Sequence, residues 1–235
     1  MPVFQLSRKL VFPPPYLADD DGLLAIGGDL QERRLLLAYS LGIFPWYADG
    51  YPIMWWSPDP RLVLFPGELH VSRSLRQTIS KGVYHVTLDR AFEKVVENCA
   101  RVTRKGERGT WITKDMKDAY VHLHRSGYAH SVESWCEGHL SGGLYGVALG
   151  GVFFGESMFT KMRDASKVAF VRLVAQLQAW GFTLIDCQIP TRHLVSLGAR
   201  EISRAEFMRR LSRALHVCTT QGRWSFDSPD NAPDH

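Results

Sequence analysis

Residues 130–159 constrain the fold most, because apolar and polar positions alternate there with a period of two. The runs HSVESWC, LSGGLYGVAL and VFFGESMF are separated by Glu137-Gly138 and Gly150-Gly151. Two-residue turns that contain glycine, placed between runs rich in β-branched and aromatic residues, are typical of β-hairpins. The sequence therefore predicts an antiparallel meander of three strands.

A helix and a fourth strand follow the meander. Apolar residues at 168, 171, 174, 177 and 180 predict a helix over 165–180, and Gly181 ends it. The run TLIDCQI at 183–189 predicts a short buried strand, followed by a short helix near 192–197 and a last helix from Ser203 to about 215. This order of three strands, a helix, a strand and a helix resembles the late part of a GNAT-type acyltransferase. The resemblance is one of fold alone, and it implies an α+β fold with a GNAT-like α/β domain over 61–222.

Residues 1–60 form a different kind of region, dense in proline, glycine and aromatic residues. They predict a small mixed domain packed on the larger one, with a helix that begins after an Asp29-x-x-Glu32 capping box and reaches residue 40. Its loops carry the aromatics Phe44, Trp46, Trp55 and Trp56. These aromatics form either a hydrophobic lid over the later sheet or a stacking platform for a base. Residues 223–235 are predicted to be a polar tail.

Between the two regions the pattern predicts short alternating elements. Strands are expected at 62–65 and 83–88, and helices are expected to begin after Ser72, Asp89 and Thr113. Arg73 and Arg76 lie three residues apart on the first of these helices, and Lys81 follows it. Such a cluster is either solvated surface charge or a contact for phosphates.

Composition excludes few classes of function. The 235 residues carry a net charge of +4, which permits a polyanionic partner without requiring one. Neither the four cysteines nor His122, His124 and His130 have metal-ligand spacing, so no metal is expected. We expect a cytoplasmic protein with no membrane span, because the start lacks a signal peptide and the longest apolar run, 142–155, is short and rich in glycine.

Three polar residues in the late strands are the candidates for a reacting centre. Glu156 stands between Phe154 and Met158, and on a regular strand these three side chains share one face. Asp186 and Gln188 are two residues apart in a buried strand, so both are expected on one face. A structural ion pair or hydrogen bond is the alternative reason for a carboxylate among apolar neighbours.

The motifs together resemble one family. GLLAIGGDL, GIFPWY, WWSPDPR, GTWIT, GGLYGV, FFGESMF, DASK, LIDCQ and HLVSLGA occur in family order between residues 22 and 199. This set is similar to that of the leucyl/phenylalanyl-tRNA–protein transferases. The resemblance implies a cytoplasmic monomer without cofactor that moves Leu, Phe or Met from aminoacyl-tRNA to the N-terminal Arg or Lys of a protein. The product is tagged for degradation through the N-degron route.

The resemblance also implies roles for individual residues. Trp46 and Trp111 match positions that hold the 3′-terminal adenosine, and Arg73, Arg76 and Lys81 match the cluster associated with the tRNA acceptor stem. The positions for the donor's side-chain pocket are Leu144, Phe153, Met158, Phe170 and Leu173; family members can carry Met at 144 and Phe at 173 instead.

The resemblance assigns catalysis to Asp186, Gln188 and Glu156. Gln188 is expected to accept a hydrogen bond from the attacking amine, Asp186 to stabilise the developing ammonium, and Glu156 to fix Gln188 or the donor's amino group. A competing account passes the proton through the 2′-hydroxyl of the terminal adenosine. Two other classes stay open at this point: an acyl-CoA-dependent transferase, although Thr160–Ser166 lacks the glycines of the usual acetyl-CoA turn, and a non-catalytic RNA-binding module.

Overall fold

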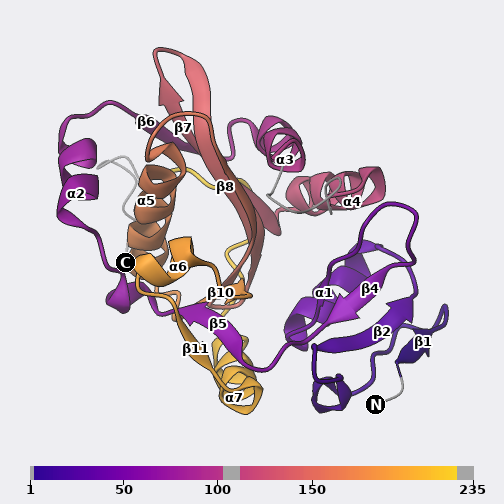
Figure 1. Cartoon of the computed structure of the whole chain (residues 1–235). Helices are drawn as coiled ribbons and strands as arrows, with labels where there is room; N and C mark the ends of the chain where they lie inside the picture. Colours follow the sequence, from indigo (N-terminus) through magenta and orange to yellow (C-terminus); the bar gives the residue numbers. More distant parts are fainter. Residues whose placement is uncertain (1–2, 103–111, 227–235) are drawn as a thin grey trace.

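The computed structural model describes residues 3–102 and 112–226, and it contains two β-sheets flanked by helices (Figure 1). The smaller sheet has the order β1-β2-β4-β3. Its strands are β1 (Phe4–Leu6), β2 (Leu23–Gly27), β3 (Phe44–Pro45) and β4 (Met54–Trp56). The 3₁₀ turn η1 (Pro15–Leu17) precedes β2, and α1 (Glu32–Ser40) follows it.

The larger sheet has seven strands in the order β11-β5-β10-β9-β8-β7-β6. Neighbouring strands of this sheet are antiparallel, except that β9 and β10 run parallel to each other. The bounds are β5 (Arg61–Leu64), β6 (His85–Leu88), β7 (Ala129–Cys136), β8 (His139–Leu149), β9 (Val152–Thr160), β10 (Leu184–Gln188) and β11 (Arg200–Ile202). Helix α5 (Ala165–Ala179) forms the crossover that a parallel pair requires.

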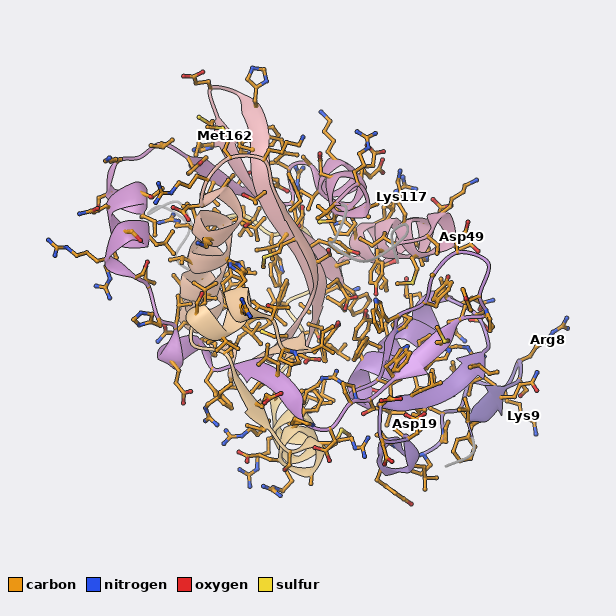
Figure 2. All side chains as sticks on the ribbon, in the orientation of Figure 1. Arg8, Lys9, Asp19, Asp49, Lys117 and Met162 are labelled. Carbon is orange, nitrogen blue, oxygen red and sulfur yellow. The ribbon has the colours of Figure 1, made fainter. Side chains whose placement is uncertain are left out.

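Helices cover both faces of the larger sheet. Helix α5 and α2 (Arg73–Ser80), which follows the 3₁₀ turn η2 (Pro66–Glu68), lie on one face, whereas α3 (Phe92–Ala100) and α4 (Lys114–Arg125) lie on the other, beside the smaller sheet (Figure 1). The short α6 (Arg192–Ser196) and α7 (Arg204–Ala214) complete the fold. Figure 2 shows that side chains fill the space between the two sheets, and one core cluster draws residues from both.

The expected α+β class and the order of meander, helix, strand and helix are confirmed by these elements. Ser72, Thr113 and Ser203 cap their helices as predicted, each accepting a backbone N–H three residues on. The boundary near residue 60 lies between β4 and β5 and remains a prediction.

Two predicted caps are wrong. Gln31 occupies the cap position of α1, and the carboxylate of Asp29 binds the Gln31 backbone N–H before the helix begins. Helix α3 begins after Ala91. The carboxylate of Asp89 does not cap it, because it accepts hydrogen bonds from the backbone N–H groups of Ser131 and Trp224.

The predicted polar tail begins too early. Trp224 is only 3% exposed, and its indole ring stacks on the imidazole of His130 with the centroids 3.6 Å apart. Its backbone N–H donates to Asp89 at 2.7 Å. Residue 224 therefore belongs to the packed core on the α5 side of the sheet.

Candidate active site

A cavity of about 350 Å³ opens between β8, β9, β10, α5 and α6. Its size is at the low end for sites that bind small molecules, and most of its wall is apolar. Helix α5 contributes Phe170 to its wall, and the loop after β3 contributes Trp46. The apolar side chains that line the cavity include Phe44, Trp46, Leu144, Phe153, Met158, Phe170, Ile185, Ile189 and Leu194.

Glu156 lies on the wall of this cavity at a β-bulge. Tyr145 pairs with Ser157 and Gly146 pairs with Gly155, so Glu156 is an extra residue that has no partner on β8. A bulge shifts the alternation of side chains along a strand. The prediction that Phe154, Glu156 and Met158 share a face is therefore wrong: Phe154 packs in the core shared with the smaller sheet, whereas Met158 packs against the α5 side.

Two buried tyrosines bind the Glu156 carboxylate. Tyr39 donates to Oε1 at 2.8 Å, and Tyr120 donates to Oε2 at 2.7 Å. Burial raises the pKa of Glu156 from 4.5 to about 7; the hydrogen bonds from Tyr120 and Tyr39 oppose the rise, and the charge of Asp186 adds to it. This carboxyl therefore titrates close to neutral pH.

Gln188 joins Glu156 to the end of β10. Its Nε2 donates to Oε1 of Glu156 at 3.0 Å, and its side chain lines the cavity. The backbone of Gln188 has a φ of +64°, a left-handed conformation that costs a non-glycine residue about 1–2 kcal/mol. A register shift between Asp186 and Gln188, relative to β5, accompanies this turn.

Asp186 lies behind Gln188 and does not line the cavity. It is fully buried, and its carboxylate accepts two hydrogen bonds from Arg61, Nε to Oδ1 at 2.9 Å and a terminal nitrogen to Oδ2 at 2.7 Å. Oδ1 also accepts the backbone N–H of Gln188 at 2.9 Å. Asp186 thus holds the left-handed turn that directs Gln188 into the cavity.

Arg61 is itself tightly held. Its guanidinium lies 4.7 Å from the ring centroids of both Phe44 and Phe207, and its side chain is 1% exposed. A buried guanidinium without its carboxylate, or the reverse, would leave an uncompensated charge. Arg61 and Asp186 therefore function as one ion pair.

The structure brings most of the predicted site residues together. Four of the five predicted pocket residues line the cavity, as does Trp46, whereas Leu173 is fully buried and does not line it. Trp111 lies outside the described residues. Arg73, Arg76 and Lys81 are exposed and border a shallow hollow along α2, separate from the cavity.

Besides Arg61, the sequence did not indicate Tyr39, Tyr120 or His193 as residues of the site. Tyr39 and Tyr120 occupy apolar stripes of α1 and α4, where a phenol hydroxyl needs a buried partner, and this is the signal that could have found them. His193 also lines the cavity, with a buried Nε2 that has no hydrogen-bond partner among the described residues. Burial lowers the pKa of His193 and so favours its neutral form.

The described residues contain neither a candidate metal site nor a candidate membrane helix. No group of three or more of their His, Cys, Asp or Glu side chains is placed to bind a metal ion. No helix in 3–102 or 112–226 is both long and apolar enough to cross a membrane.

Comparison with known proteins identifies the family. The model described as "Leucyl/phenylalanyl-tRNA protein transferase" matches residues 63–212, and the model of that family's N-terminal domain matches 28–59. A "Leucyl/phenylalanyl-tRNA--protein transferase" of Anaeromyxobacter sp. (strain Fw109-5) is 60% identical over 230 residues, 98% of each chain. Another from Syntrophobacter fumaroxidans is 60% identical over 228 residues, 97% of each chain.

Solved structures resemble this chain only distantly. "The structure of L-PGS from Bacillus licheniformis" matches 72% of this chain and 53% of its own with a TM-score of 0.39 and 12% identity. A "GCN5-related N-acetyltransferase from Kribbella flavida" matches 70% of this chain and 58% of its own with a TM-score of 0.36 and 12% identity. Similarity this weak says nothing about function. The family models and the close relatives, which cover nearly the whole chain, show that it belongs to the leucyl/phenylalanyl-tRNA protein transferase family and is an aminoacyltransferase.

Proposed function

We propose that this enzyme transfers Leu, Phe or Met from its aminoacyl-tRNA to the N-terminal Arg or Lys of acceptor proteins, tagging them for degradation in the cytoplasm. The observation that carries the proposal is the apolar cavity of about 350 Å³ with Glu156 and Gln188 on its wall. Such a cavity can take one apolar side chain that is unbranched at Cβ, as those of Leu, Phe and Met are, while the polar pair faces the reacting ester. The family membership of the chain supports the same activity.

The donor's side chain is proposed to lie among Leu144, Phe153, Met158 and Phe170, with Leu173 supporting them from behind. Pocket walls of this kind discriminate by shape, and one methylene group changes binding by only about 1–3 kcal/mol. Some promiscuity among Leu, Phe and Met therefore follows. Trp46 is proposed to stack on the terminal adenosine, and Trp111 is proposed as its second wall.

Gln188 and Asp186 are proposed to have different roles in the reaction. The aminoacyl ester is already activated, so the protein needs to orient the amine and stabilise charge. We assign Gln188 as the group that orients the attacking amine. Because the charge of Asp186 is paired with Arg61, we assign Asp186 to fixing Gln188 rather than to meeting the ammonium directly.

The tRNA body is proposed to contact α2. Arg73, Arg76 and Lys81 are exposed around one surface hollow, and a row of cations there suits the phosphates of an acceptor stem. The enzyme is expected to act as a monomer and without a cofactor; both remain predictions.

A transfer assay tests the proposal. Purified enzyme is mixed with labelled leucyl-tRNA and with peptides that begin with Arg, Lys or Gly, and with the Arg peptide acetylated at its N-terminus. Label is expected on the Arg and Lys peptides and on neither of the others. Label on none of them, together with binding of acetyl-CoA, would favour an acyl-CoA-dependent transferase; tRNA binding without transfer would favour an RNA-binding module.

A further inference from the structure

Glu156, Tyr39 and Tyr120 form a closed ring of oxygen atoms. The two phenol oxygens lie 2.7 Å apart, Tyr39 Oη lies 2.8 Å from Oε1, and Tyr120 Oη lies 2.7 Å from Oε2. All three distances are in the range of O–H···O hydrogen bonds. The ring therefore has three hydrogen-bonded contacts among the oxygens of three side chains that come from α1, α4 and β9.

The number of protons in the ring decides its chemistry. An ionised carboxylate brings none and each phenol brings one, so two protons serve three contacts. One contact then places lone pairs against each other at hydrogen-bond distance. When Glu156 takes up one proton, every contact has a donor: Glu156 donates to one phenol, that phenol donates to the other, and the second donates back to the carboxyl group. The ring is thus completed by one additional proton.

The surroundings permit such a change without exposing charge to water. Tyr39 and Tyr120 are fully buried, and Glu156 is 7% exposed and lies on the cavity wall. The ionisable groups that influence Glu156 and the two phenols are Tyr145 on β8 and Asp186 on β10, and the charge of Asp186 is held by Arg61 on β5. No cation among these groups binds the Glu156 carboxylate directly.

We propose that the ring of Glu156, Tyr39 and Tyr120 is the general base of the transfer reaction, and that it takes the proton from the attacking α-amine. This inference rests on the proposed function, since it names the proton acceptor for that same reaction. Glu156 is the catalytic residue, because it faces the cavity where the amine must approach. The two tyrosines are positioning residues that share the proton once it arrives.

The atoms and protons of the step balance without a co-reactant. The neutral amine attacks the ester carbonyl, the N–C bond forms, and the carbonyl electron pair moves to its oxygen. The nitrogen loses one proton to Glu156. When the tetrahedral intermediate collapses, the bond from carbon to the ribose oxygen breaks, and the ring returns the proton to that oxygen. The pKa of Glu156, raised by burial to about 7, suits an acceptor that must also donate.

The first test compares Glu156→Gln with the wild-type enzyme under single-turnover conditions. The donor is leucyl-adenosine, in both its ribose form and its 2′-deoxy form, and the acceptor is a peptide that begins with Arg. The variant is expected to lose about 10²- to 10⁴-fold in the rate of transfer with the ribose donor, with donor affinity within a few-fold. A loss smaller than about 3-fold, together with failure of the 2′-deoxy donor in the wild type, would overturn the inference in favour of the 2′-hydroxyl. If wild-type enzyme transfers nothing even from leucyl-tRNA, the proposed function fails instead.

The tyrosine variants separate a positioning role from a structural one. Tyr120→Phe and Tyr39→Phe each remove one donor from the ionised carboxylate, so each should move the rise in rate with pH to higher pH and lower the plateau. Tyr84→Phe is the matched control, because its hydroxyl donates to a backbone carbonyl, that of Arg163, at 2.6 Å and away from the ring. An unchanged pH profile in both ring variants would overturn the shared role of the tyrosines.

Infrared difference spectroscopy tests the ring without substrate. In the wild type a protonated-carboxyl C=O band is expected to disappear as pH rises through about 7, and this band should be absent from Glu156→Gln. The measurement remains informative if a variant is inactive for another reason. A spectrum in which no carboxyl band titrates near neutral pH would contradict the inference.

Discussion

Nε2 of Gln188 lies 3.0 Å from Oε1 of Glu156, although the two residues stand on different strands and each lies at an irregularity of its strand. The bulge on β9 turns Glu156 toward the tyrosines, and the left-handed turn at the end of β10 brings Gln188 to meet it. β-Bulges are found beside active sites for this reason, because they re-aim a side chain without ending the sheet. The polar edge of the cavity is therefore set by two local departures from regular strand geometry.

The ion pair of Arg61 and Asp186 should control turnover through Gln188. We predict that Arg61→Met lowers the free energy of unfolding by about 3–5 kcal/mol, since it leaves a buried carboxylate unpaired. In the folded variant kcat should fall more than donor affinity does, because Gln188 loses its support. Arg61→Lys should recover only part of the free energy of unfolding and only part of kcat, because an ammonium group cannot form the paired hydrogen bonds of a guanidinium.

Arg34→Met is the control for that experiment. Arg34 is an equally buried arginine, but it binds the backbone oxygens of Ser7 and Lys9 in the N-terminal region. Its replacement should lower stability and leave kcat of the folded enzyme near the wild-type value. Equal effects of the two variants on kcat would show that Arg61 matters only for folding.

Leu144 should set the balance between donors. Leu144→Phe adds bulk to the cavity wall, so kcat/KM for a phenylalanyl donor should fall relative to that for a leucyl donor by roughly 10- to 200-fold. The measurement is competition between the two labelled donors in one reaction. Leu173→Met, which changes a fully buried residue that does not line the cavity, should leave the ratio within a few-fold. A ratio unaffected by Leu144→Phe would place the donor's side chain elsewhere.

The basic residues of α2 should account for part of the salt dependence of tRNA binding. Replacing Arg73 and Arg76 with Ala should reduce the slope of log K against log salt by about 1 for each phosphate that these side chains neutralise in the wild type. Arg210→Ala is the control, because Arg210 is exposed on α7 and is paired with Glu206. Equal slopes in the double variant and the wild type would remove α2 from the tRNA-binding surface.

Glu156 should also make stability depend on pH. Its pKa is raised from 4.5 to about 7 in the folded protein, so between these values the folded chain binds more protons than the unfolded chain. The free energy of unfolding should therefore fall as pH rises through this window, by at most about 1.4 kcal/mol per pH unit.

The lowered pKa values of His130 and His193 act in the opposite direction, since the unfolded chain then binds more protons near pH 6. Denaturant unfolding of Glu156→Gln alongside the wild type separates the two effects. The difference between the two proteins should shift steadily in favour of the variant as pH rises from 5 to about 7. A constant difference would mean that Glu156 titrates normally.

The larger elements of this fold could be predicted because their signals are local. Glycine turns, alternating residues and the caps at Ser72, Thr113 and Ser203 lie within a few positions of the elements they define. Asp89 has equally good cap chemistry, yet its carboxylate binds Ser131 and Trp224, more than forty residues away. Long-range partners of this kind cannot be read from spacing.

Prediction of the candidate active site from the sequence was limited in the same way, because its contacts join residues far apart in the chain. The prediction that Glu156 and Gln188 lie together in a polar pocket needed only the assumption of adjacent strands. Arg61 lies in a proline-rich run, where nothing indicates its partner. Tyr39 and Tyr120 lie on α1 and α4 among other buried residues, so the sequence alone does not separate them from ordinary core residues. The bulge at Glu156 reversed the face expected for Met158, because one extra residue changes the alternation beyond it.

The most direct measurement is a crystal structure of the enzyme with an amide-linked phenylalanyl-adenosine, which cannot be hydrolysed or transferred. The phenyl ring is expected to lie among Leu144, Met158 and Phe170, with the reacting carbonyl beside Gln188 and Glu156. A ligand bound outside this cavity, or one whose carbonyl faces away from both polar side chains, would contradict it.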